Sequence, residues 1–252
     1  MRLDQYLVEM GAHKSRHRAQ IEIKAARIIV NGEPVIKPSY TVKEDDHIVV
    51  LEPYNPYVSQ GGLKLEHALQ IFNLSFKDKT VLDIGASTGG FTDCALKHGA
   101  KKVYAIDVGT AQLDVSLRDN PQVISIEKTN FLDIKKHQFE DIDYIVMDVS
   151  FVSGLSLIFH ANMLYEAPII WLIKPQFETL KTPKSGVIKN PKLHFEVLES
   201  IQKRLNQHQL YIQHGIPSPI KGQNGNIEFL SLIDSTKHWI DIAALIEKSR
   251  TR

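Results

Sequence analysis

Two polar residues, Asp148 and Lys174, each follow directly on a short apolar run of the sequence. Such runs, here residues 144–147 and 169–173, are typical of buried parallel strands. Because the carboxyl ends of parallel strands open on one crevice, we expect both side chains to face a common ligand. The alternative for Lys174 is a lysine that extends its ammonium from the sheet edge into solvent. Two further candidates join them, Lys64 and Glu228.

A glycine-rich turn follows an earlier apolar run, residues 81–84. Glycines there let the backbone approach a ligand and begin a helix whose N-terminus faces it. Ser87 stands where a dinucleotide fingerprint needs its second glycine, and Gly-Lys-Ser/Thr is absent from the sequence, so we exclude a P-loop. The turn is similar to the first motif of class I S-adenosylmethionine methyltransferases, which implies Asp83 near the sulfonium and amino-acid end. The implied cofactor residues here are Asp83, Gly85, Ser87, Gly89, Gly90 and Phe91.

Further polar residues end the next two expected strands, residues 103–106 and 123–126. Asp107 closes the first of them, where a carboxylate can accept hydrogen bonds from both ribose hydroxyls of a nucleotide. Asp133, beyond the second, is placed to accept from an adenine amino group. Asn130 is either a ligand or a residue that orients the turn. Three such features in register predict an adenosine site, hence S-adenosyl-L-methionine as the cofactor.

The residues after Asp148 narrow the chemistry further. Methyltransferases that act on exocyclic amines usually carry two prolines and an aromatic residue here, whereas this chain reads Val-Ser-Phe. Carbon-5 methylation of pyrimidines needs a thiolate near the same strand end, but the single cysteine, Cys94, lies in the helix after the glycine turn, where it is expected to pack in the core. Both kinds of base methylation are therefore disfavoured.

The elements that must position these groups form two predicted domains. From residue 59 apolar strands alternate with helices, which predicts a doubly wound, Rossmann-like α/β domain over residues 59–252. Residues 1–58 predict a small α+β domain and a linker, with helices around Leu3–Met10 and after Ser15, strands at 28–30 and 47–51, and a turn at Asn31-Gly32. Residues 239–246 predict a packing helix.

The N-terminal domain carries a local basic cluster although the net charge is only +1. We expect Ala19, Ile23 and Ala26 to form the apolar face of its second helix, with Arg16 and Arg27 projecting to nearly the same side. A solvated helix face is the alternative. The order of motifs resembles the S4 RNA-binding domain, which implies contact with RNA phosphates and shape. The implied RNA-binding residues are Arg2, Lys14, Arg16, Arg18, Lys24 and Arg27.

Across the whole chain the motifs resemble the TlyA family of haemolysin A-like ribosomal RNA 2′-O-methyltransferases, which join an S4 domain to an FtsJ-like methyltransferase domain. The matching segments begin Ser-Gln-Gly-Gly-Leu-Lys, Asp-Ile-Gly, Asp-Val-Ser-Phe, Lys-Pro-Gln-Phe-Glu and Gly-Asn. The resemblance implies ribose 2′-O-methylation of a cytidine by a catalytic tetrad. Gln60 occupies a loop position where an arginine would be expected to contact phosphate. The implied tetrad is Lys64, Asp148, Lys174 and Glu228.

In this interpretation Lys174 is the central group, Lys64 its electrostatic neighbour, and the two carboxylates orient them. A lysine deprotonates a hydroxyl only when it is partly neutral, a state favoured by burial and by a second ammonium. The segment 179–189 is either an RNA clamp or a solvated loop. The alternatives to the enzyme are a non-catalytic RNA-binding or ribosome-assembly protein and, less favoured, a membrane-lytic protein.

Composition bears on whether the chain is a membrane, secreted, disulfide-bonded or metal-binding protein. Hydrophobic residues make up 43% and charged residues 23% of the chain, as in ordinary globular proteins. No apolar run approaches bilayer length, and the start lacks a signal-peptide core, so we expect a cytoplasmic protein without a membrane partner. One cysteine precludes an intramolecular disulfide, and no metal site is expected. Ribosomal RNA or a ribosomal subunit is the expected partner; the oligomeric state is left open.

Overall fold

The computed structural model describes residues 1–13, 15–51, 55–136 and 138–250 of the chain. The chain divides between Pro56 and Tyr57 into two compact units, Met1–Pro56 and Tyr57–Arg252. Each unit has a hydrophobic core of its own. No helix within the described ranges is both long and apolar enough to cross a bilayer.

The first unit packs two helices on a small antiparallel sheet of strand order β2-β1-β3. Leu3 and Leu7 of α1, Ile23 of α2 and Ile28 of β1 are fully or almost fully buried in its core. The expected helices, the first strand and the Asn-Gly turn are confirmed. The elements are α1 (Leu3–Glu9), α2 (Arg16–Lys24), β1 (Ile28–Val30), β2 (Glu33–Pro34) and β3 (Ile48–Val50).

Helix α2 begins as expected and ends earlier than expected. The side chain of Ser15 accepts a hydrogen bond from the backbone N–H of Arg18 and caps the start. Ala26 adopts a left-handed φ of 57°, and the N–H of Arg27 donates to the carbonyl of Glu22, which closes the helix in a Schellman-type turn. The predictions that Ala26 belongs to the helix face and that Arg27 projects beside Arg16 are therefore wrong.

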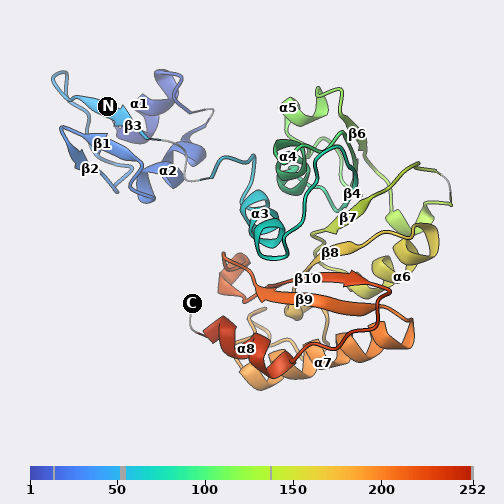
Figure 1. The fold of residues 1–252 in the computed structure, drawn as a ribbon. Coiled ribbons are helices and arrows are strands. Elements are labelled where there is room, and N and C mark those ends of the chain that lie inside the picture. The colour runs from blue at the N-terminus through green and yellow to red at the C-terminus, as the bar shows by residue number, and fades with distance from the viewer. Residues whose placement is uncertain (14, 52–54, 137, 251–252) are drawn as a thin grey trace. The chain divides into compact units, whose positions relative to one another are not determined.

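The second unit is built on a seven-stranded sheet of order β6-β5-β4-β7-β8-β10-β9. Strands β4 to β8 are parallel to one another, which confirms the Rossmann-like α/β fold, whereas β10 runs antiparallel to both β8 and β9 (Figure 1). The strands are β4 (Thr80–Ile84), β5 (Lys102–Ile106), β6 (Val123–Ile126), β7 (Tyr144–Met147), β8 (Ile169–Ile173), β9 (Tyr211–Pro217) and β10 (Phe229–Asp234).

Helices cover both faces of this sheet. Alternate residues of a strand face opposite sides, so Val81 packs with α3 and α4, whereas Leu82 packs with α6, α7 and α8. The C-terminal helix begins at Ile242, after the expected start, and Trp239 is 63% exposed, so its assignment to a packing helix is wrong. The helices are α3 (Gly61–Ile71), α4 (Gly90–Lys97), α5 (Val115–Arg118), α6 (Gly154–Leu164), α7 (Pro191–Gln207) and α8 (Ile242–Arg250).

Candidate active site

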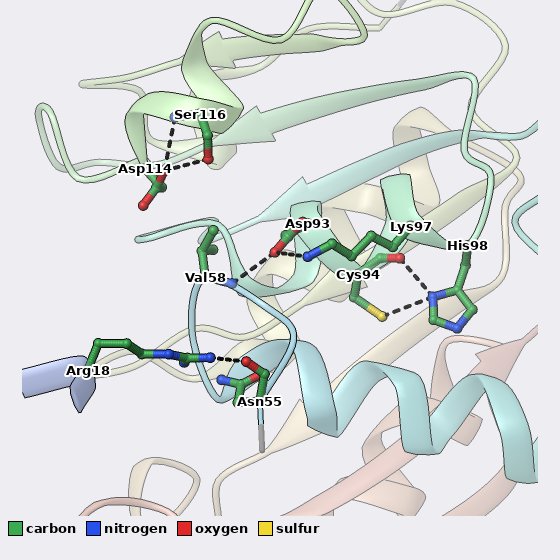
Figure 2. A network of polar contacts seen from close by, with 9 residues as sticks. All are labelled: Arg18, Asn55, Val58, Asp93, Cys94, Lys97, His98, Asp114 and Ser116. Atoms are coloured by element: carbon green, nitrogen blue, oxygen red, sulfur yellow. Dashed lines mark hydrogen bonds and ion pairs between the residues drawn. The ribbon is translucent and has the colours of Figure 1, made fainter. Parts of the chain in front are cut away.

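The start of α3, which carries Lys64, is anchored to α4. The Asp93 carboxylate accepts hydrogen bonds from the backbone N–H of Val58 at 2.8 Å and from the Lys97 ammonium at 3.0 Å (Figure 2). A Cβ atom built on Gly90 would lie 2.2 Å from the Ser59 hydroxyl, so only glycine allows the two segments to approach this closely. The buried Cys94 packs beside these contacts, as expected, and serves the core of the unit.

Antiparallel pairing brings the fourth expected catalytic residue to the site. Phe229 of β10 pairs with Ile173 of β8. Because the two strands run in opposite directions, Glu228, just before β10, lies at the same edge as Lys174, just after β8. Residues far apart in the sequence therefore meet at the carboxyl end of the parallel strands.

The four expected catalytic side chains form two close ion pairs. The Lys64 ammonium lies 2.6 Å from the Glu228 carboxylate, and the Lys174 ammonium lies 2.6 Å from that of Asp148. Lys64 is 8% exposed and Glu228 is 3% exposed, so their pair is almost fully removed from water. All four residues line one cavity of about 960 Å³, which is large enough for a cofactor and part of a substrate.

Ser150 is a further member of this group that the sequence motifs contain but did not single out. Its hydroxyl accepts a hydrogen bond of 2.7 Å from the Lys174 ammonium. The carboxylate of Glu178 accepts from the Ser153 hydroxyl and from the Gly154 N–H, both at 2.7 Å, and so fixes the end of the same loop. Burial raises the pKa of Glu178, although these two hydrogen bonds oppose the shift.

The other half of the cavity is formed after β4, β5 and β6. Gly85 has a φ of 81°, and a Cβ atom at this position would lie 2.8 Å from the Val149 side chain, which explains the glycine. The Asp107 carboxylate accepts hydrogen bonds from the N–H groups of Ser87 and Gly109 at 2.8 and 2.7 Å. Asn130 caps the turn after β6, where its side chain accepts from the Leu132 N–H, and it also lines the cavity.

Five of the expected cofactor residues, Asp83 among them, lie outside the cavity lining. Gly89 has a φ of 93° and begins α4, whereas Phe91 is buried in the core beside α3. Gly90 packs against Ser59, as described for the helix contact. Asp133 is exposed in the short 3-10 helix Phe131–Asp133, and the cavity is lined there by Asn130, Phe131 and Leu132.

Asp83 is fully buried behind this turn. One carboxylate oxygen accepts a hydrogen bond of 2.6 Å from the Thr92 hydroxyl, and the other finds no partner among the described residues. Burial raises the pKa of Asp83 to about 7, with a smaller opposing effect of Thr92 and a smaller supporting effect of the Asp148 charge. The backbone turn, the Asp107 carboxylate and this buried acid fit a cationic adenosyl cofactor.

Asn226 is another residue that sequence analysis missed. Its side-chain oxygen accepts from the Ile188 N–H at 3.0 Å, and its amide nitrogen donates to the Gly186 carbonyl at 2.9 Å. Both partners belong to the segment 179–189, so the two bonds hold that segment beside the cavity, which Gly186 lines. Asn226 lies in one of the segments that resemble the family, but the resemblance did not predict its hydrogen bonds to the segment 179–189.

Several arginines expected to bind RNA instead form ion pairs with carboxylates of the first unit. Arg2 and Arg16 both donate to Asp4, at 2.9 and 3.1 Å, and Arg2 above all lowers the pKa of that buried acid. Arg18 pairs with Glu22. It also donates to the carbonyl of Asn55 (Figure 2).

Three further RNA-binding candidates have different surroundings. Lys24 is exposed at the end of α2, and Arg27 is half-buried. Gln60, in the second unit, is exposed at the start of α3 and makes no side-chain capping bond. Lys14 lies outside the described residues. No group of three or more metal-binding side chains is found in the parts of the chain that the structure describes.

The parallel sheet, the glycine turn after β4 and the carboxylate after β5 define a class I S-adenosylmethionine-dependent methyltransferase. Residues 57–234 match the FtsJ-like methyltransferase family, and residues 1–48 match the S4 domain. The chain therefore belongs to the FtsJ-like methyltransferases and, by the relatives below, to the TlyA family.

Relatives from three bacteria support this placement. The chain is 42% identical over 246 residues to Hemolysin A of Brachyspira hyodysenteriae, an alignment that covers 92% of this chain and 98% of the relative. It is 35% identical to the 16S/23S rRNA (cytidine-2′-O)-methyltransferase TlyA of Mycobacterium tuberculosis, with 90% and 87% covered. The solved structure of a candidate hemolysin from Streptococcus thermophilus is 33% identical, with a TM-score of 0.76 and coverage of 100% and 96%.

Proposed function

We propose that this enzyme methylates the ribose 2′-hydroxyl of a cytidine in ribosomal RNA. The observation that carries the proposal is the meeting of two lysine–carboxylate pairs, Lys64–Glu228 and Lys174–Asp148, in the cavity that the glycine turn also lines. A hydroxyl needs both orientation and loss of its proton, which such groups provide. The names of the relatives from Mycobacterium tuberculosis and Campylobacter jejuni agree with this chemistry.

Lys174 is the group closest to the reaction in this proposal. It contacts both Asp148 and Ser150, so its nitrogen is held at a fixed position. As an amine it accepts the proton of the hydroxyl, whose oxygen it also orients. Lys64 supplies a positive charge to the same cavity, and Glu228 and Asp148 hold the two lysines in place. Much of the rate enhancement comes from holding the reacting groups in line.

S-adenosyl-L-methionine, when bound, supplies the electrophilic methyl group. The residues suited to hold it are Gly85 and Ser87 of the turn, Asp107 after β5 and Asn130 after β6, all of which line the cavity. Each carboxylate oxygen of Asp107 accepts one hydrogen bond from a backbone N–H group. Each oxygen keeps a lone pair that can accept a hydrogen bond from a ribose hydroxyl. Asp83, buried behind the turn with a pKa raised to about 7, supplies negative charge there in its ionised form.

The RNA is held by surfaces outside these groups. Phe151 at the cavity is 85% exposed, and its ring lies 5.3 Å from that of Phe177, so the pair offers an aromatic face to an unstacked base. In the S4 domain Lys24 offers an exposed charge to phosphate. A partner that is ribosomal RNA or a ribosomal subunit supports a cytoplasmic location for the enzyme.

Methyl transfer from labelled S-adenosylmethionine to ribosomal subunits and to free ribosomal RNA tests the proposal. The wild type is expected to produce a linkage that resists alkaline hydrolysis, because a methylated 2′-oxygen cannot attack the adjacent phosphate. Lys174→Ala is expected to lose transfer, whereas Lys77→Ala, at an exposed lysine outside the cavity, retains it. Label on a base, or full activity of Lys174→Ala, would contradict the proposal.

A further inference from the structure

Two loops at the edge of the cavity carry a local excess of positive charge. The chain as a whole is nearly balanced, with 30 basic and 29 acidic residues. Residues 179–192 and 218–227, by contrast, contain no aspartate or glutamate and hold five lysines: Lys181, Lys184, Lys189, Lys192 and Lys221. A basic run of this kind is often only a solvated surface, so its position relative to the site decides what it can bind.

Asn226 joins the two loops beside the cavity. Its side-chain amide donates to the Gly186 carbonyl and accepts from the Ile188 N–H, and its own carbonyl accepts from the Gly222 N–H at 2.9 Å. Gly186, Asn224 and Asn226 all line the cavity. The loops are therefore fixed at the rim of the cavity, since both are hydrogen-bonded to one buried residue that lines it.

Lys184, Lys189 and Lys221 lie within two residues of the backbone groups that these hydrogen bonds hold. All three side chains are exposed. Within the described ranges no carboxylate forms an ion pair with any of the three, whereas the ammonium of Lys181 lies 2.9 Å from the carboxylate of Glu196. Three ammonium groups without a counter-ion among the described residues thus border the cavity.

The cofactor does not use these charges. S-adenosylmethionine carries no phosphate, and the residues suited to hold it follow β4, β5 and β6. The two lysine loops instead follow β8 and β9, at the other end of the sheet, on the side of Lys174 and Glu228 where the substrate is expected. RNA carries a negative charge on each phosphate, so a strand that places one nucleotide in the cavity brings several phosphates to its rim.

We propose that Lys184, Lys189 and Lys221 bind phosphates of the RNA strand next to the nucleotide to be methylated. The inference rests on the proposed function for its substrate, and it adds to the S4 domain a second phosphate-binding surface on the catalytic unit. Because the ammonium groups contact the backbone and not the base edges, they hold the strand without reading its sequence. Their effect is on RNA affinity and not on the methyl-transfer step.

The test replaces the three lysines together by glutamine, which removes the charges and keeps most of the side-chain length. In the variant Lys184→Gln, Lys189→Gln, Lys221→Gln the KM for ribosomal RNA is expected to rise about tenfold, the combined effect of three exposed ion pairs, while kcat stays near the wild-type value. Filter binding of the full chain to ribosomal RNA at several salt concentrations, without cofactor, is the second measurement. The slope of log affinity against log salt is expected to fall by about 3, one for each phosphate contact. Arginine at the same three positions keeps the charges and is expected to keep both values.

The matched control is the same triple change at Lys77, Lys101 and Lys237. These lysines are exposed and lie at the opposite edge of the sheet, since two of them precede β4 and β5 and the third follows the antiparallel β10. Replacing them by glutamine makes the same change in net charge and is expected to leave KM and the salt slope near the wild-type values.

Three outcomes would overturn the inference. Wild-type KM and slope in the loop variant mean that the three lysines are only solvated, and equal changes in both triple variants mean that net charge alone acts. A loss of kcat or of cofactor binding at unchanged RNA affinity means that the loops act on the structure of the site. A wild type that binds RNA but transfers no methyl group contradicts the proposed function alone, because the binding comparison still decides whether these lysines hold RNA.

Discussion

The ammonium of Lys64 lies 2.6 Å from the carboxylate of Glu228, although 164 residues separate them in the chain. The pair connects the first turns of α3 to the residue just before β10, two elements that come from distant parts of the sequence. Its burial makes it costly to break, since each charge would remain in a poorly hydrated environment without its partner.

Removing one member of the pair is expected to cost both stability and activity. Glu228→Ala leaves the Lys64 ammonium unpaired and lowers the free energy of unfolding by about 3 kcal/mol. The double variant Lys64→Met with Glu228→Gln removes both charges and regains much of that loss, although it stays inactive. Urea unfolding and methyl-transfer assays check this. Equal stability of the single and double variants would show that the pair contributes no coupling.

The buried acid behind the glycine turn makes stability depend on pH. Its folded-state pKa of about 7 lies above the ordinary value of 3.8, so the folded protein holds the Asp83 proton more tightly than the unfolded chain. The free energy of unfolding therefore falls as pH rises from about 4 through about 7. Asp83→Asn removes this contribution.

The measurement is urea unfolding of wild type and Asp83→Asn at pH 5.5 and pH 8. The variant is expected to lose less stability between the two pH values, because it stays uncharged while the wild type must bury an ionised carboxylate. Parallel changes in the two proteins would assign the pH dependence to other groups.

Asn226→Ala is expected to release the segment 179–189. The variant loses the hydrogen bonds to Gly186 and Ile188, so trypsin cleaves faster at Lys184 and methyl transfer falls several-fold, while the unfolding midpoint changes little. Asn162→Ala, at an exposed asparagine of α6, is the matched control. Limited proteolysis with fragment masses checks it, and cleavage at the wild-type rate would show that the segment is held by other contacts.

Lys24→Ala is expected to weaken binding to ribosomal RNA across sequences and to reduce the slope of log affinity against log salt by about 1. The reason is that Lys24 is exposed, whereas Arg16 shares the buried Asp4 with Arg2. Filter binding at several salt concentrations measures both quantities, with Lys101→Ala as control. An unchanged slope would place the phosphate contacts elsewhere.

The five parallel strands could be predicted because each is a short, mostly apolar run; β4 and β8 are buried throughout, whereas the edge strand β6 is partly exposed but keeps its apolar sequence. β9 was missed because an edge strand needs burial only in part, and its centre reads Gln213, His214 and Gly215. The early end of α2 was missed because its left-handed closing residue is Ala26, and alanine normally favours continuing a helix.

The position of a polar residue at a strand end was enough to predict that Asp107, Asp148 and Lys174 line one cavity, since the fold brings such ends together. The contacts of Asn226 could not be predicted, because they depend on a loop whose path follows from tertiary packing. The glycine turn was expected to contact the cofactor throughout, yet Gly90 serves the crossing of two helices.

The late position of β10 also bears on how the protein is made. Lys64 is synthesised early and gains its counter-ion only when the strand after Glu228 pairs with β8. A premature stop codon between β8 and β10 would leave a polypeptide with the strands of the adenosyl crevice and an ammonium without its carboxylate. The strands of the adenosyl crevice are thus encoded before the carboxylate that completes the Lys64 ion pair.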